Sequence, residues 1–157
     1  MAFSIFFVLT WLAVFTFGVI QKKLSLVENT FVFLITLIVS INFSWIVMNE
    51  LELIKRTEET LPYTASLLNR SIIIPVLLLI QLNMSMARDS FLWKTVVMLS
   101  AVLVLVGLSY LMTALNITDN TDWNLGLDAI YFFLLNLIAY FAYWVMESVS
   151  EKAVNQS

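Results

Sequence analysis

The chain contains no cysteine and no histidine, and each absence removes a class of chemistry. Without cysteine the chain can supply no thiolate nucleophile, no disulfide and no ligand for an iron–sulfur cluster. Without histidine it lacks the commonest general base and the commonest metal ligand. Its three glycines are too few for a glycine-rich phosphate-binding loop. We therefore expect no enzymatic activity, no metal site and no cofactor.

Charged residues are also scarce. They make up 12% of the chain, whereas 61% of its residues are hydrophobic and the mean hydropathy is +0.94. A typical soluble domain is about 25% charged and about 45–50% apolar. The composition therefore excludes a water-soluble globular protein and indicates an integral membrane protein. We expect it to contact membrane lipids and not to bind nucleic acid.

Five apolar runs are long enough to cross a membrane, because a bilayer core of about 30 Å takes about 20 helical residues. The runs cover residues 3–20, 25–48, 72–87, 95–115 and 126–146. They predict an all-α fold, a polytopic integral membrane helical bundle with about five transmembrane helices. The chain has no internal repeat and no linker, so we expect residues 1–157 to form a single domain.

Local signals mark several helix ends. Ser25 followed by Glu28 is the pattern of a capping box and predicts a helix start. Pro62 is tolerated in a first helical turn and predicts the start of another helix. Pro75 removes a backbone donor inside the third run and predicts a kink there. Asp128 falls in the first turn of the fifth run, where the helix dipole favours an anion.

The helical pattern of the second run continues past the membrane stretch, over residues 49–56. If this segment is helical, an apolar stripe lies beside charges in i to i+4 pairs, which predicts a helix that projects from the membrane by two or three turns. The projecting stripe is a candidate surface for another subunit. The alternative is that it packs against residues 62–68 of the same chain. The surface comprises Val47, Leu51, Ile54, Lys55 and Arg56.

Lysine and arginine placement predicts the orientation, since cytoplasmic loops carry the excess of these residues. If the N-terminus lies outside, the inner side holds five basic residues and the outer side three. The inner set is Lys22, Lys23, Arg88, Lys94 and Lys152, and the outer set is Lys55, Arg56 and Arg70. We therefore expect a multi-pass protein of the cell membrane with its N-terminus outside and its C-terminus in the cytoplasm.

Polar side chains at membrane depth must find a partner there or cost several kcal/mol. Four amides qualify: Asn42, Gln81, Asn83 and Asn136. Gln81 and Asn136 both fall near mid-membrane, where they could bond to each other or line a small polar cavity. The alternatives are hydrogen bonds between helices and a ligand or ion site.

Three functional classes fit these features. The first is an accessory or structural subunit of a larger membrane complex, which associates with other membrane proteins or with itself. The second is a small homo-oligomeric transporter or channel. The third is a receptor for an apolar ligand held among aromatic side chains such as Trp11, Phe43, Tyr140 and Tyr143. We favour the accessory subunit, because the helices are uniformly apolar and one of them is predicted to project.

Overall fold

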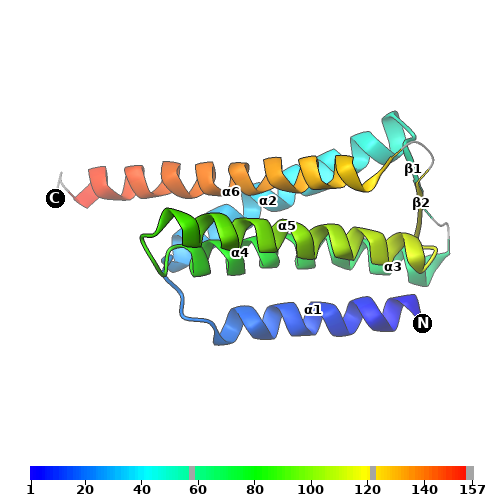
Figure 1. Cartoon of the computed structure of the whole chain (residues 1–157), viewed down its shortest axis with the longest axis horizontal. Coiled ribbons are helices and arrows are strands. Elements are labelled where there is room, and N and C mark those ends of the chain that lie inside the picture. Colours follow the sequence, from blue (N-terminus) through cyan, green and yellow to red (C-terminus); the bar gives the residue numbers. More distant parts are fainter. Residues whose placement is uncertain (57–58, 121–122, 155–157) are drawn as a thin grey trace.

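A computed structural model describes residues 1–56, 59–120 and 123–154 of the chain. Six α-helices and two π-helical turns account for most of it (Figure 1). The helices are α1 (Ala2–Val19), α2 (Leu26–Trp45), α3 (Thr60–Leu68), α4 (Ile74–Ser85), α5 (Phe91–Ala114) and α6 (Leu125–Val154). The π-helical turns η1 (Ile46–Glu50) and η2 (Asn69–Ile73) extend α2 and join α3 to α4. Two short strands, β1 (Ile54–Arg56) and β2 (Thr118–Asn120), pair at one end of the bundle.

Five continuous helical segments are long and apolar enough to cross a membrane, as the sequence predicts. They are Ala2–Val19, Leu26–Glu50, Thr60–Ser85, Phe91–Ala114 and Leu125–Val149. In Figure 1 they lie side by side along one direction, with the N-terminus at the end that carries the strands and the C-terminus at the opposite end. The predicted helical bundle is confirmed.

The segment Thr60–Ser85 is the centre of the bundle. In its most apolar stretch 67% of the residues are buried, against 17–28% in the other four segments. It packs against α1, α2, α5 and α6, and side chains such as Ala65, Leu78 and Leu82 are fully enclosed. Most residues of the most apolar stretches of the other four segments are therefore not buried inside the bundle.

Pro75 follows a change of helical register. The Ile74 N–H bonds to the Asn69 carbonyl, five residues earlier, as in a π-helix. In that register the next donor would bond to the Arg70 carbonyl, but proline has no N–H. The Ser40 hydroxyl of α2 donates to this carbonyl instead, at 3.2 Å. The proline therefore leaves a backbone acceptor that ties α2 to the central segment.

The predicted helical extension over residues 49–56 is wrong. The second helix ends with η1 at Glu50, Glu52 adopts a left-handed backbone conformation with φ of 51°, and β1 follows. Strand β1 pairs antiparallel with β2, which places Lys55 opposite Asp119. The backbone groups of residues 54–56 thus bond to a segment more than sixty residues away, a pairing that helical periodicity cannot reveal.

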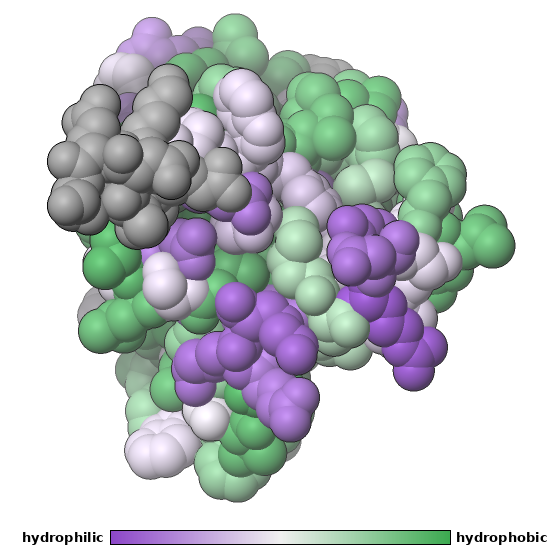
Figure 2. Space-filling model, turned by 90° about the vertical axis from the view of Figure 1, so that its left-hand side faces the viewer, coloured by the Kyte–Doolittle hydropathy of each residue, from purple (hydrophilic) through white to green (hydrophobic). Residues whose placement is uncertain are grey.

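The end of the bundle without strands collects hydrophilic side chains. It holds the α1–α2 connection and the α4–α5 turn (Figure 1), and Figure 2, which faces this end, shows hydrophilic patches with hydrophobic side chains around them. Lys22, Lys23 and Arg88 are exposed in these two connections. Here the predicted capping box is present, because Ser25 and Glu28 each accept from the other's backbone N–H.

Helix α5 ends in a Schellman motif. The Ile117 N–H bonds to the Met112 carbonyl at 2.9 Å and the Asn116 N–H bonds to the Thr113 carbonyl at 3.0 Å. Asn116 lies between these bonds in the left-handed region, with φ of 54°. Ile117 then packs, fully buried, in the same apolar cluster as Met112.

This geometry predicts opposite effects of two substitutions at Asn116. Asn116→Gly should keep or slightly raise the free energy of unfolding, because glycine adopts positive φ without steric cost. Asn116→Val should lower it by about 1–3 kcal/mol, because a β-branched residue is strained there. Unfolding in mixed detergent–SDS micelles, followed by circular dichroism, measures both. An equal loss in the two variants would show that the asparagine side chain matters and not its backbone conformation.

Candidate functional site

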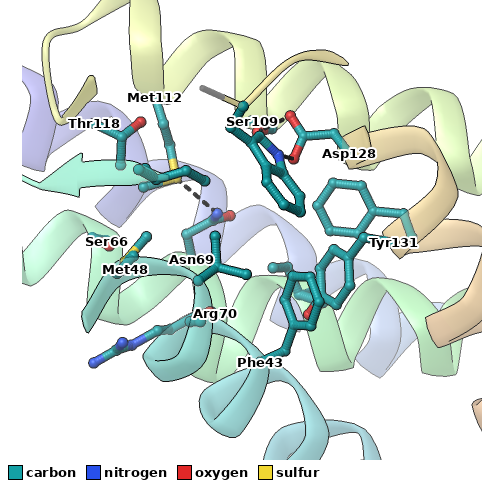
Figure 3. A pocket seen from close by; sticks show the side chains of 16 residues that line it. Phe43, Met48, Ser66, Asn69, Arg70, Ser109, Met112, Thr118, Asp128 and Tyr131 are labelled. Carbon is teal, nitrogen blue, oxygen red and sulfur yellow. Dashed lines mark hydrogen bonds between the residues drawn. The ribbon is translucent and has the colours of Figure 1, made fainter. Parts of the chain in front are cut away.

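A polar cavity lies inside the strand-bearing end of the bundle (Figure 3). Its lining comes from α2, η1, β1, α3, η2, α4, α5, β2 and α6, and from the connection that precedes α6. The volume is about 70 Å³, which gives room for about five water-sized groups at about 10–15 Å³ each. Asp128 is the acidic side chain in its lining, and two other voids of the described residues, one beside Gln81 and one beside Leu134, have none.

Asp128 is the charged centre of this cavity. It is 5% exposed, and its two oxygens accept from Ser109 Oγ at 2.6 Å and from Trp123 Nε1 at 2.8 Å. Such short distances are typical of donors to an ionised carboxylate. The carboxylate also lies in the first turn of α6, where the helix dipole favours negative charge.

Both donors to Asp128 are neutral. Within the described part of the chain, no lysine or arginine forms an ion pair with this carboxylate, and the ion pair that is present joins Lys94 to Asp89 at the opposite end. Arg70 lines the same cavity, but Figure 3 shows its guanidinium directed away from Asp128. The negative charge is therefore held by hydrogen bonds without a compensating cation.

Two other buried polar atoms at this cavity, Asn69 Oδ1 and Arg70 Nε, have no hydrogen-bond partner among the described residues. Asn69 is only 6% exposed, and its amide nitrogen donates to the Met112 sulfur at 3.0 Å, a weak acceptor. Each unpaired buried group costs about 1–3 kcal/mol. The Asn69 oxygen is therefore an acceptor, in the same cavity as a carboxylate, that a bound donor can satisfy.

An aromatic wall closes one side of the cavity. Phe43 of α2 stacks on Tyr131 of α6, with ring centres 3.9 Å apart and planes at 9°. Trp123 meets Phe43 edge-on at 6.0 Å. These contacts hold the indole where its N–H reaches Asp128.

The residues of the predicted partner surface do not form one outward stripe. Val47 is 3% exposed, and it lines the cavity together with Ile54. Leu51 is 57% exposed and Lys55 is exposed. The side chain of Arg56 lies outside the described residues. The chain reversal after η1 directs Val47 and Ile54 to the cavity and leaves Leu51 exposed.

Gln81 and Asn136 are buried as predicted, but each bonds elsewhere. The Gln81 amide donates to the Tyr140 hydroxyl at 3.0 Å, and that hydroxyl also bonds to Ser85. The Asn136 amide donates to the Phe132 carbonyl of its own helix. Among the described residues, the amide oxygens of Gln81 and Asn136 have no hydrogen-bond partner.

Asn83 joins two helices to the α1–α2 connection. Its oxygen accepts from the backbone N–H groups of Lys23 and Leu24 at 2.8 and 3.1 Å, and its nitrogen donates to Asn29 Oδ1 and to the Leu79 carbonyl, both at 2.9 Å. The side chain is fully buried and fully bonded. Asn42, in contrast, is exposed on α2 and donates to the Ile38 carbonyl of its own helix.

The sequence gives only a weak signal for the Asp128 cavity. It places Asp128 in a first helical turn, where an anion is ordinary, and Trp123 near the end of an apolar run, where tryptophan is common. Asn69 and Ser109 carry no pattern that connects them with Asp128. They meet because the helices pack, and helical spacing within one run cannot show that.

No known family model, curated protein or solved structure matches the chain. A helical bundle alone does not indicate a function. Any functional conclusion must therefore come from the residues and geometry of the site.

Asn83 and Asn42 make a matched test of the hydrogen bonds around Asn83, which we call the Asn83 cluster: the Asn83 side chain is buried and bonds to other segments, and the Asn42 side chain is exposed. Asn83→Leu should lower the free energy of unfolding by about 2–6 kcal/mol, because four hydrogen bonds are lost at about 0.5–1.5 kcal/mol each. Asn42→Leu should change it by less than about 0.5 kcal/mol, since that side chain is exposed and bonds only within its helix. Unfolding in mixed micelles measures both changes. If the two variants lose equal stability, the Asn83 bonds do not hold the connection in place.

Proposed function

We propose that the chain is a non-catalytic, multi-pass membrane protein that binds a small cationic ligand beside Asp128. The observation that supports this is a buried carboxylate held only by neutral donors, in a cavity that also holds the unpaired oxygen of Asn69. At 4 Å, a unit positive charge attracts such a carboxylate by about 4 kcal/mol at an effective dielectric constant of about 20. A cation is therefore the ligand that gains most at this site.

The groups around the carboxylate favour a protonated amine. Asn69 Oδ1 has no partner among the described residues and lines the same cavity, and together with the carboxylate it can accept N–H groups from one ammonium. The cavity of about 70 Å³ suits a group of that size. A divalent cation fits less well, because calcium and magnesium sites usually use more than one carboxylate, and no cluster of three potential metal ligands occurs among the described residues.

The arrangement favours ligand binding over conduction. An apolar layer follows the cavity along both α4 and α6, formed by Ile74, Leu78, Leu105, Phe132 and Leu135. The next polar groups along α4 and α6, which are Asn136 and the pair of Gln81 with Tyr140, follow this layer. A polar path through the bundle is therefore interrupted, which supports a receptor-like or carrier-like site near one membrane face.

The accessory-subunit hypothesis loses the projecting helix on which it was based. Its remaining support is the apolar outer surface, which includes Trp11 at 65% and Leu103 at 72% exposed, and lipid can cover such a surface as well as protein can. Mass measurement of intact complexes extracted in mild detergent tests it. A second protein at fixed stoichiometry would restore this hypothesis, and the chain alone would exclude it.

We also propose that the strand-bearing end, with the N-terminus, faces the outside and that the C-terminus is cytoplasmic. The support is the basic connections at the other end, which carry Lys22, Lys23 and Arg88. Because the chain has no cysteine, a single cysteine added at either terminus can be labelled from one side of the membrane to test this.

Replacing Asp128 tests the proposed ligand site. Asp128→Asn keeps the shape of the side chain and removes its charge, so it should weaken the binding of radiolabelled methylammonium at least about tenfold, which corresponds to about 1.4 kcal/mol. Equilibrium dialysis of the protein in phosphatidylcholine nanodiscs at low ionic strength measures the dissociation constant. Glu147→Gln is the matched control, because this carboxylate lies near the other end of α6 and bonds to Tyr143. Unchanged binding in Asp128→Asn would contradict the proposal.

A further inference from the structure

We infer that the ligand is an amphiphilic amine, with its ammonium group beside Asp128 and its hydrocarbon tail in a groove between α2 and α6. This inference rests on the proposed function and narrows the ligand from small cations to single-chain, membrane-soluble amines. It is drawn from a second void on the other side of the aromatic wall.

The second void is an apolar groove of about 250 Å³. Its sides are aliphatic residues of α2 and α6, among them Val39, Leu127, Ile130, Leu134 and Ile138. Ile130 and Leu134 are 59% and 51% exposed, so the groove opens toward the outside of the bundle. In a membrane that outside is hydrocarbon, and the occupant of such a groove is an alkyl chain.

The groove and the polar cavity share one wall. Phe43, Trp123 and Tyr131 line both, and Figure 3 shows the Tyr131 ring between α6 and the interior of the cavity. Side chains therefore separate the two voids at this place. The inferred binding mode therefore requires the Tyr131 or Phe43 ring to rotate from its stacked position, so that the ammonium and the tail are joined across this wall.

The dimensions fit a molecule with one charged end. Asp128 lies in the first turn of α6, which keeps the ammonium group near one membrane face. The groove follows α6 from Leu127 to Ile138, a rise of about 16 Å at about 1.5 Å per residue. That is about half of a bilayer core of about 30 Å. An alkyl chain in the groove thus runs from the headgroup level to the centre of the membrane, as lipid chains do.

Displacement of bound methylammonium by dodecylammonium tests the inference, with the full chain in phosphatidylcholine nanodiscs. Dodecylammonium should displace methylammonium from the wild type at low concentration. Leu134→Trp fills the groove and should raise the dodecylammonium concentration needed at least tenfold, while methylammonium binding is unchanged. Leu137→Trp is the control, since Leu137 is exposed on α6 but does not line the groove; it should alter neither amine.

The outcomes separate the two proposals. If methylammonium binds and Leu134→Trp leaves dodecylammonium displacement unchanged, the groove is not part of the site and the inference is wrong, while the proposed function stands. If the wild type binds neither amine, both are wrong. Displacement by phosphatidylethanolamine added to the nanodiscs, without displacement by dodecylammonium, would also overturn the single-chain ligand. If Leu134→Trp loses methylammonium binding, Ile130→Trp replaces it, because Ile130 also lines the groove. The inference is then wrong if Ile130→Trp binds methylammonium and leaves displacement by dodecylammonium unchanged.

Discussion

Apolar side chains offer no hydrogen bonds, so each polar group buried inside this bundle needs a partner from the chain or from a molecule bound within it. The requirement shapes the whole interior. The carbonyl that Pro75 leaves without an N–H partner receives the Ser40 hydroxyl, and the amides of the α1–α2 connection reach Asn83. The requirement is not met everywhere among the described residues: Gln81 Oε1 and Asn136 Oδ1 lack partners in the middle of the bundle, and Asn69 Oδ1 lacks one at the Asp128 cavity. What distinguishes the Asp128 cavity is that such an atom shares a void with a buried carboxylate.

Two kinds of surface meet at the aromatic wall of this cavity. On one side, the Trp123 indole N–H supports a carboxylate, and on the other its ring faces an apolar groove. An amphipathic side chain such as tryptophan can serve both because only one edge of its ring is polar. The stacking of Phe43 on Tyr131 fixes the boundary between them. Polarity therefore changes from charged to fully apolar across the thickness of single side chains.

The sequence predicts those features of this protein that are local. Apolar runs locate the five long helices, and the spacing of Ser25 and Glu28 locates a helix start, because each depends on neighbouring residues. The predicted helical extension over residues 49–56 is wrong, because β1 forms there and its partner strand lies more than sixty residues away in the sequence. The Asp128 site is hidden for the same reason: Asn69, Ser109 and Asp128 come from three different helical segments, and only their packing brings one buried charge and an unpaired oxygen to the same cavity.

The Asn83 cluster also sets an order of events during synthesis. Lys23 precedes Asn83 by 60 residues, and its backbone N–H donates to the Asn83 side chain. At synthesis rates of about 5–20 residues per second, Asn83 is therefore added about 3–12 s after Lys23. Until then, water must satisfy the amides of Lys23 and Leu24. The first two helices can form early, but their connection cannot pack into the bundle before α4 has been made. The last turn of α4 thereby completes a structure that the first helices begin.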